Sequence, residues 1–153
     1  MSRKKQYVKK AFESTGRTSD VSANLYLSML ISPAWLALTT RQRQLYLYMK
    51  LQYYAVADKH HPNGDKLQFC FNWGLARNYK LYTNQKSFRD DIAALIEKGF
   101  IKCIQSGYNT KEKSIYQYSD KWQIWGNSNY KIDFNEMNLT GQHKQLSQKI
   151  KSK

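Results

Sequence analysis

The stretch WGLARNYKLYTNQKSFRDDIAALIEKGFIKCIQSG, residues 73–107, contains the clearest structural signal in the chain. Apolar residues recur at helical spacing in its second half, and Gly99 follows the last of them, as is typical of a helix C-terminus. Thr83 stands where a residue would cap the start of this helix. The apolar stripe, which we expect to face a core, consists of Phe88, Ile92, Leu95 and Ile96.

A shorter helix and a β-hairpin flank this amphipathic helix. Asn72 is suited to cap a helix over WGLARNY, and residues 80–82 form the turn that separates the two helices. On the other side, residues 100–104 and 114–118 have strand character, and the turn residues at 106–110 lie between them. The sequence therefore predicts a helix, a turn, a second helix and then a hairpin.

Upstream of this unit, the pattern predicts two short strands and one long, largely buried helix. The alternation over residues 25–29 permits a short strand, and Ser32 begins a brief helical turn. Thr39 or Thr40 caps the long helix, which has a wide apolar face. Residues 67–71 alternate weakly, as in a short strand. The whole pattern indicates an α+β fold.

The chain is strongly basic, and the charge is unevenly distributed. Its 153 residues carry 25 Lys and Arg against 11 Asp and Glu, for a net charge of +14. Residues 1–17 hold six Lys or Arg and one Glu, and residues 141–153 hold four Lys and no acidic residue. We interpret residues 18–140 as one domain between two disordered basic tails. A polyanionic partner is expected, and the tails either bind its phosphates or only keep the protein soluble.

Several classes of function lack the residues they need. No apolar run approaches the roughly 20 residues of a membrane span, and the start MSRKKQYVKK is unlike a signal peptide, so we expect a cytoplasmic protein without membrane insertion. Cys70 and Cys103 are too few for a disulfide framework, and His60 and His61 have no partner at metal-ligand spacing. No phosphate-binding glycine loop or nucleophile motif is present, which argues against an enzyme and against a cofactor.

The run of residues 73–107, followed by NTKEKSIYQY, resembles the core of winged helix-turn-helix proteins. Its most specific piece is AALIEKGFIKCI, in which the apolar stripe of a helix passes through a glycine directly into a strand. The resemblance implies a helical core with a C-terminal β-hairpin wing over residues 42–118, and double-stranded DNA as the partner. In general character the chain is also similar to small accessory proteins of Gram-positive plasmids and conjugative elements, namely TraN-type transfer or replication proteins.

In winged helix-turn-helix proteins the N-terminal part of the recognition helix enters the major groove, and the hairpin tip reaches the adjacent backbone or minor groove. Because the apolar stripe faces the core, the polar side chains at the start of this helix should point outward. Asp90 and Asp91 would be repelled by DNA, so contact should be confined to the first turns. The expected DNA-binding residues are Lys80, Thr83, Asn84, Gln85, Lys86, Arg89, Asn109, Lys111 and Lys113.

The sequence leaves several functions open. The leading hypothesis is sequence-preferring binding of duplex DNA by an accessory factor in plasmid or conjugative DNA transfer or replication. The alternatives are a transcriptional repressor of a mobile element and an adaptor that docks a relaxase or secretion component. Aromatic rings that stack on unpaired bases are a further alternative, for which Tyr82 and Tyr108 are the side chains expected to be exposed. In the simplest interpretation, the polar face of the helix is only solvated.

Overall fold

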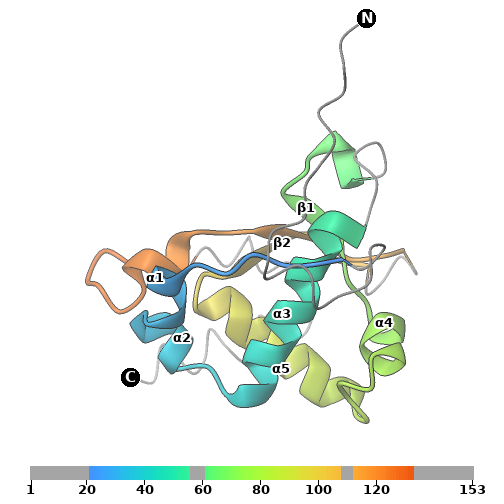
Figure 1. Cartoon of the computed structure of the whole chain (residues 1–153), viewed down its shortest axis with the longest axis horizontal. Coiled ribbons are helices and arrows are strands. Elements are labelled where there is room, and N and C mark those ends of the chain that lie inside the picture. The colour runs from blue at the N-terminus through green and yellow to red at the C-terminus, as the bar shows by residue number, and fades with distance from the viewer. Residues whose placement is uncertain (1–20, 56–60, 108–111, 133–153) are drawn as a thin grey trace, which may run out of the picture.

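The computed structural model describes residues 21–55, 61–107 and 112–132 (Figure 1). Within these residues the chain is α+β, as expected, with five α-helices, two 3-10 turns and a small antiparallel sheet. The proposed tails, residues 1–17 and 141–153, lie outside the described residues. In chain order the elements are α1 (Leu27–Leu30), α2 (Pro33–Leu36), α3 (Thr40–Ala55), η3 (Pro62–Gly64), β1 (Gln68–Cys70), α4 (Trp73–Asn78), α5 (Gln85–Glu97), β2 (Ile101–Gln105), β3 (Ile115–Tyr118) and η4 (Lys121–Ile124).

The three strands form a sheet in the order β1-β3-β2, and both pairs are antiparallel. Tyr116 in the central strand pairs with Phe69 on one side and with Cys103 on the other. All three side chains are buried, and α3 and α5 lie on one side of the sheet (Figure 1). The sequence of elements from α3 to β3, with β3 in the middle of the sheet, is compatible with a winged-helix-like arrangement.

The start of α3 is fixed by a reciprocal pair of hydrogen bonds. The Thr39 N–H donates to Gln42 Oε1 at 3.0 Å, and the Gln42 N–H donates to Thr39 Oγ1 at 3.3 Å. This capping box satisfies two backbone donors at the helix N-terminus, so Thr39 is confirmed as a cap. From there α3 carries Leu45, Tyr46 and Met49 into the core.

An aromatic cluster joins the N-terminal helices to the sheet. The rings of Trp35, Tyr46 and Phe100 meet edge to face, with centroids 5.1 to 6.0 Å apart. Each comes from a different segment: α2, α3 and the residue before β2. Edge-to-face packing of this kind stabilises a core beyond simple area burial. The cluster therefore holds the N-terminal helices against the start of β2.

Helix α5 matches the expected amphipathic helix, except at its cap. The apolar stripe is buried, and Gly99 adopts φ +79° just after the C-terminus, a conformation that favours glycine. The cap is Asn84 rather than Thr83, because Asn84 Oδ1 accepts hydrogen bonds from the N–H groups of Lys86 (2.7 Å) and Ser87 (3.3 Å). Thr83 is exposed one residue earlier.

The expected strand over residues 25–29 is wrong, because Leu27–Leu30 forms the helix α1. Leu27 is 72 % exposed whereas Met29 is 3 % exposed, so the alternating residues do not share one buried face. After β3 the chain turns into η4 instead of extending the strand. The Trp122 N–H donates to the Gly99 carbonyl at 3.1 Å, and a Cβ on Gly99 would lie 2.7 Å from this backbone.

Candidate nucleic-acid interface

The first turns of α5 present polar side chains to solvent. Thr83, Gln85 and Lys86 are exposed, and Arg89 is half-buried one turn further along. The first turn of α5 carries no acidic residue. The positive end of the helix dipole is therefore reinforced by Lys86 and is suited to an anion. Asn84 caps the helix instead, because its side-chain oxygen Oδ1 accepts hydrogen bonds from two N–H groups of the first turn.

Lys80 lies in the tight turn between α4 and α5. Its φ of 56° is left-handed, its N–H donates to the Arg77 carbonyl at 2.8 Å, and the Leu81 N–H donates to the Ala76 carbonyl at 3.0 Å. These bonds end α4 and turn the chain toward α5. The Lys80 side chain is exposed beside the start of α5.

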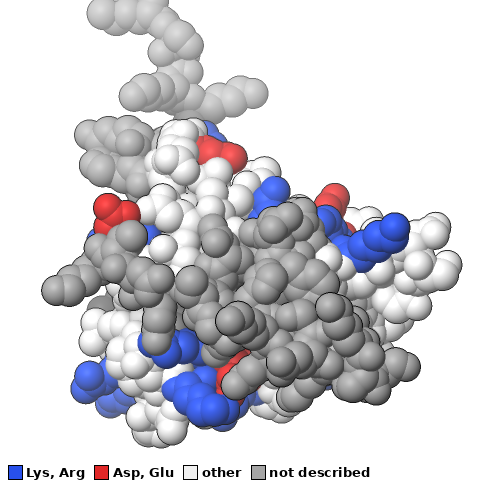
Figure 2. All heavy atoms as spheres, turned by 180° about the vertical axis from the view of Figure 1, so that it is seen from behind, with Lys and Arg blue, Asp and Glu red and all other residues white. Residues whose placement is uncertain are grey.

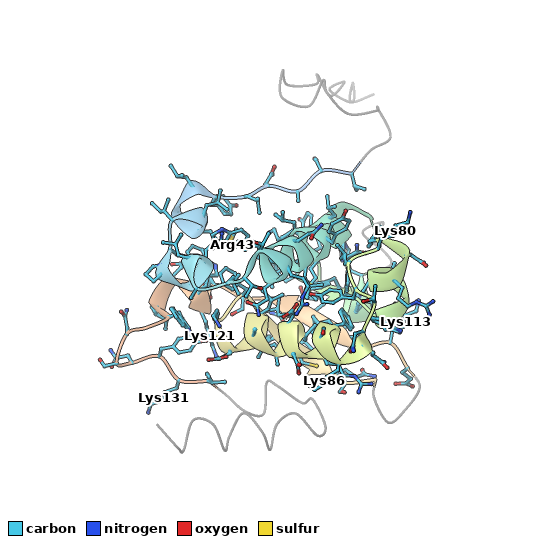
Figure 3. The ribbon with its side chains drawn as sticks, turned by 90° about the horizontal axis from the view of Figure 1, so that it is seen from below. Arg43, Lys80, Lys86, Lys113, Lys121 and Lys131 are labelled. Carbon is cyan, nitrogen blue, oxygen red and sulfur yellow. The ribbon has the colours of Figure 1, made fainter. Side chains whose placement is uncertain are left out.

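Three lysines from separate segments lie at the same end of the molecule: Lys80 from the turn, Lys86 from α5 and Lys113 from the hairpin (Figure 3). We call this surface, made of Lys80, Thr83, Gln85, Lys86, Arg89 and Lys113, the basic end. Seen from behind, basic side chains gather at the lower left, on the side where α4 and the start of α5 lie (Figure 2). The structure thus places the three labelled lysines of the expected set toward one end of the molecule.

The described part of the hairpin contributes Lys113 to this end of the molecule. Asn109 and Lys111 lie outside the described residues, and Lys113 is exposed. Next to it stands the exposed Glu112, which accepts a hydrogen bond from Gln105 Nε2 at 2.8 Å. The described part of the tip therefore carries one charge of each sign.

Asp90 and Asp91 differ completely in their surroundings, although both were expected to limit DNA contact to the first turns of the helix by their charge. Asp90 is exposed, and its Oδ2 lies 2.9 Å from Lys86 Nζ one helical turn earlier. Asp91 is 3 % exposed and points into the protein, so the expectation that its charge repels DNA is wrong. The cause is its place in the helical repeat, three residues after Phe88 and one before Ile92.

Asp91 is the centre of a buried polar network that the sequence analysis missed. Its carboxylate forms an ion pair with Arg41 and accepts hydrogen bonds from Gln42 Nε2 (3.1 Å) and the Tyr82 hydroxyl (2.7 Å). The network joins the start of α3 and the turn before α5 to the middle of α5. We infer that it fixes the orientation of α5, and with it the basic end. No sequence pattern pairs residues about fifty positions apart.

Tyr82 is buried, which contradicts the expectation that its ring is exposed for stacking on bases. Its side chain packs edge to face on Phe88 with centroids 5.5 Å apart, and the Arg41 guanidinium lies 5.3 Å from the ring centroid. Burial and the hydrogen bond to Asp91 raise the pKa of Tyr82. Tyr108, the other ring expected to be exposed, lies outside the described residues.

Arg77 is a further basic residue next to this surface that was not assigned to it. It is exposed on α4, and its guanidinium lies 6.0 Å from the ring centroid of Trp73, four residues earlier. The spacing of an aromatic residue and an arginine on one helix face is visible in the sequence and could have identified it.

The described residues contain no group of three His, Cys, Asp or Glu side chains that could hold a metal ion. His61 is buried with Nδ1 3.1 Å from the Gln68 carbonyl, whereas His60 lies outside the described part of the chain. Cys70 and Cys103 are free thiols, and burial raises the pKa of Cys103 to about 11. None of the helices in the ranges described has the length and apolar character to cross a membrane.

Comparison with known proteins does not assign this chain to a family. No protein-family model matches it, and no curated protein or solved structure shows significant similarity to it.

Proposed function

We propose that the protein binds double-stranded DNA through its basic end, with the first turns of α5 in the major groove. The observation that carries this proposal is that Lys80, Lys86 and Lys113, from three separate segments, all lie toward one end of the molecule (Figure 3). The opposite face of α5 is buried in the core, so the helix can present only this side to a partner. An exposed helix start flanked by lysines from a turn and a hairpin matches the shape and charge of a DNA groove.

Within this surface we assign different tasks to different side chains. Gln85 has a donor and an acceptor and Arg89 has donors that can read base edges, whereas Lys80 and Lys113 suit phosphates. Lys86 contacts DNA in competition with Asp90, with which it forms an ion pair. Asn84 positions the helix start. Its side-chain oxygen Oδ1 already caps the helix, so it is not available for a bidentate contact with adenine.

The surroundings of the aromatic residues favour a duplex over unpaired bases at this surface. Tyr82, the ring nearest to the start of α5 in sequence, is buried and bonded to Asp91. Stacking on single strands needs exposed rings. The ring of Tyr82 is therefore not available for stacking, which supports duplex DNA as the partner of the basic end.

For the biological role, we propose an accessory function in plasmid or conjugative DNA transfer or replication. This narrower proposal rests on the resemblance of the sequence to small accessory proteins of such elements. A footprint on the DNA of the parent element separates the roles: protection near a transfer or replication origin supports the proposal, and protection confined to a promoter indicates a repressor.

The proposed partner is tested by titrating duplex DNA and a single strand of the same sequence at two salt concentrations. Because lysine contacts release condensed counterions, duplex affinity should fall steeply as salt rises. The duplex should also compete better than the single strand. Duplex affinity that does not change with salt would contradict duplex binding by the basic end.

A further inference from the structure

A second basic region of the molecule is recessed rather than exposed. A half-open cavity of about 900 Å³ lies between the segment before α1, the helix α3, the strands β2 and β3, and η4. Its volume lies within the range of small-molecule binding sites. We call it the aromatic cavity, after the four aromatic residues along its wall: Tyr26, Tyr46, Tyr118 and Trp122.

Three lysines from three different elements line the aromatic cavity: Lys50 from α3, Lys102 from β2 and Lys121 from η4. Of the described residues along its wall, only Asp120 is acidic. The cavity is therefore positively charged and distinct from the basic end, since Lys121 lies toward the opposite end of the molecule from Lys80, Lys86 and Lys113 (Figure 3).

Lys50 is the most informative of these lysines. Its ammonium lies 4.8 Å from the ring centroid of Tyr118, whose hydroxyl donates to the Met49 carbonyl at 2.7 Å and so fixes the ring. Burial lowers the pKa of Lys50, and among the described residues no carboxylate is paired with it. An ammonium that is half removed from water without a carboxylate gains most from an anion that enters the cavity.

The wall also provides surfaces for a planar group. Tyr26 is 67 % exposed and, among the described residues, makes no ring contact. Trp122 lines the cavity while its ring is nearly parallel to that of Phe100, at an interplanar angle of 8°. Gln117, which pairs with Lys102 across the sheet, adds an amide donor and acceptor. Rings and amides beside lysines are the elements that bind a base next to a phosphate.

We propose that the aromatic cavity binds a nucleotide unit, with its phosphate at Lys50, Lys102 and Lys121 and its base against Tyr26 and Trp122. The unit is either a free nucleotide or one nucleotide of a single strand, because both offer the same phosphate and base. This site is independent of duplex binding by the basic end.

The test uses calorimetric titration of the full chain with three probes: deoxyadenosine monophosphate, a short single-stranded oligodeoxynucleotide and inorganic phosphate. We expect a nucleotide probe to bind more tightly than phosphate, because phosphate lacks the base. Binding of the mononucleotide identifies a free nucleotide as a sufficient ligand, and binding of the oligonucleotide alone identifies a strand.

Two variants locate the site. Tyr26→Ala removes an exposed ring and should weaken nucleotide binding roughly tenfold, the size expected for one lost stacking contact, while phosphate binding is unchanged. Lys102→Gln should weaken both nucleotide and phosphate binding. The matched control is Lys86→Gln, which removes the same charge at the basic end and should not affect binding of deoxyadenosine monophosphate or phosphate.

The proposal is overturned if neither nucleotide probe binds to a protein that still binds duplex DNA. It is also overturned if Tyr26→Ala and Lys102→Gln bind the nucleotide probes as tightly as the parent. Failure of duplex binding with nucleotide binding retained would overturn the proposed function and leave the cavity proposal intact.

Discussion

The basic end and the aromatic cavity both contain three lysines, but they present them in opposite ways. Lys80, Lys86 and Lys113 are exposed side chains on a turn, a helix and a hairpin. The lysines of the aromatic cavity are partly buried between elements and lie beside aromatic rings. The first arrangement suits a long polyanion that stays largely hydrated, whereas the second suits a single small anion that leaves water.

This difference shows why the net charge of +14 does not by itself identify a binding surface. Exposed lysines act additively and are screened by salt, so their effect depends on how many of them reach phosphates. Recessed lysines depend on the shape and rings around them, so one substitution can remove the site. The following predictions use this contrast.

The largest effect is expected for Asp91→Ala, which removes the centre of the buried polar network that orients α5 and the basic end. Loss of the carboxylate leaves the buried Tyr82 hydroxyl without its acceptor and should cost about 1–3 kcal/mol of the free energy of unfolding. Urea denaturation measures this change. At temperatures where the variant is folded, duplex binding should weaken while nucleotide binding in the aromatic cavity is retained.

Asp90→Asn is the matched control, because it removes the neighbouring carboxylate at an exposed position. Its stability should change by no more than about 0.5 kcal/mol, and its duplex affinity should rise because Lys86 is released. An Asp91→Ala protein as stable as Asp90→Asn would show that the buried network does not hold α5.

Smaller effects are expected for Lys80→Gly, which should raise the stability of the protein but weaken its binding to duplex DNA. Glycine adopts the left-handed φ of this position without steric cost, so the variant should gain up to about 1 kcal/mol of stability. The lost charge should weaken duplex binding at the same time. Thermal unfolding and duplex titration measure the two changes, and weaker binding together with lower stability would instead indicate a damaged turn.

The smallest effect concerns pH. Because burial lowers the pKa of Lys50, this side chain loses its charge at a lower pH than a lysine with the ordinary value of 10.5. The affinity of the cavity for a nucleotide should therefore fall a few-fold as the pH rises toward the pKa of Lys50, because the uncharged amine attracts the phosphate less. Lys50→Gln should bind more weakly and should lack this part of the pH dependence. A parent and a variant with the same pH profile would exclude Lys50 as the group that titrates.

The sequence predicted most of the local structure around α5, because each signal lay within a few residues. The apolar stripe ending at Gly99, the cap at Asn72 and the two strands of the hairpin are all confirmed. The exposed helix start was predicted for the same reason, since the buried stripe determines which side faces outward. The cap of α5 and the bounds of the two strands differ from the prediction by one residue.

The features that the sequence did not predict depend on contacts between distant segments. Asp91 meets Arg41, and the aromatic cavity draws its wall from several elements. Alternation over residues 25–29 permitted a strand, but within the described residues this segment pairs with no strand and packs Met29 into the core from a helix. Local patterns carry no information on such packing.

The most direct test of duplex binding by the basic end compares two variants of equal charge. One replaces Lys80, Lys86 and Lys113 by Gln, and the other replaces Lys50, Lys102 and Lys121 by Gln. The measurement is the salt dependence of duplex affinity for the parent and both variants. The first variant should bind duplex DNA more weakly, with the salt slope reduced by about one for each lysine that contacts a phosphate, and the second should stay close to the parent. Equal losses in the two variants would show that binding follows net charge and not the basic end, and would contradict the proposed function.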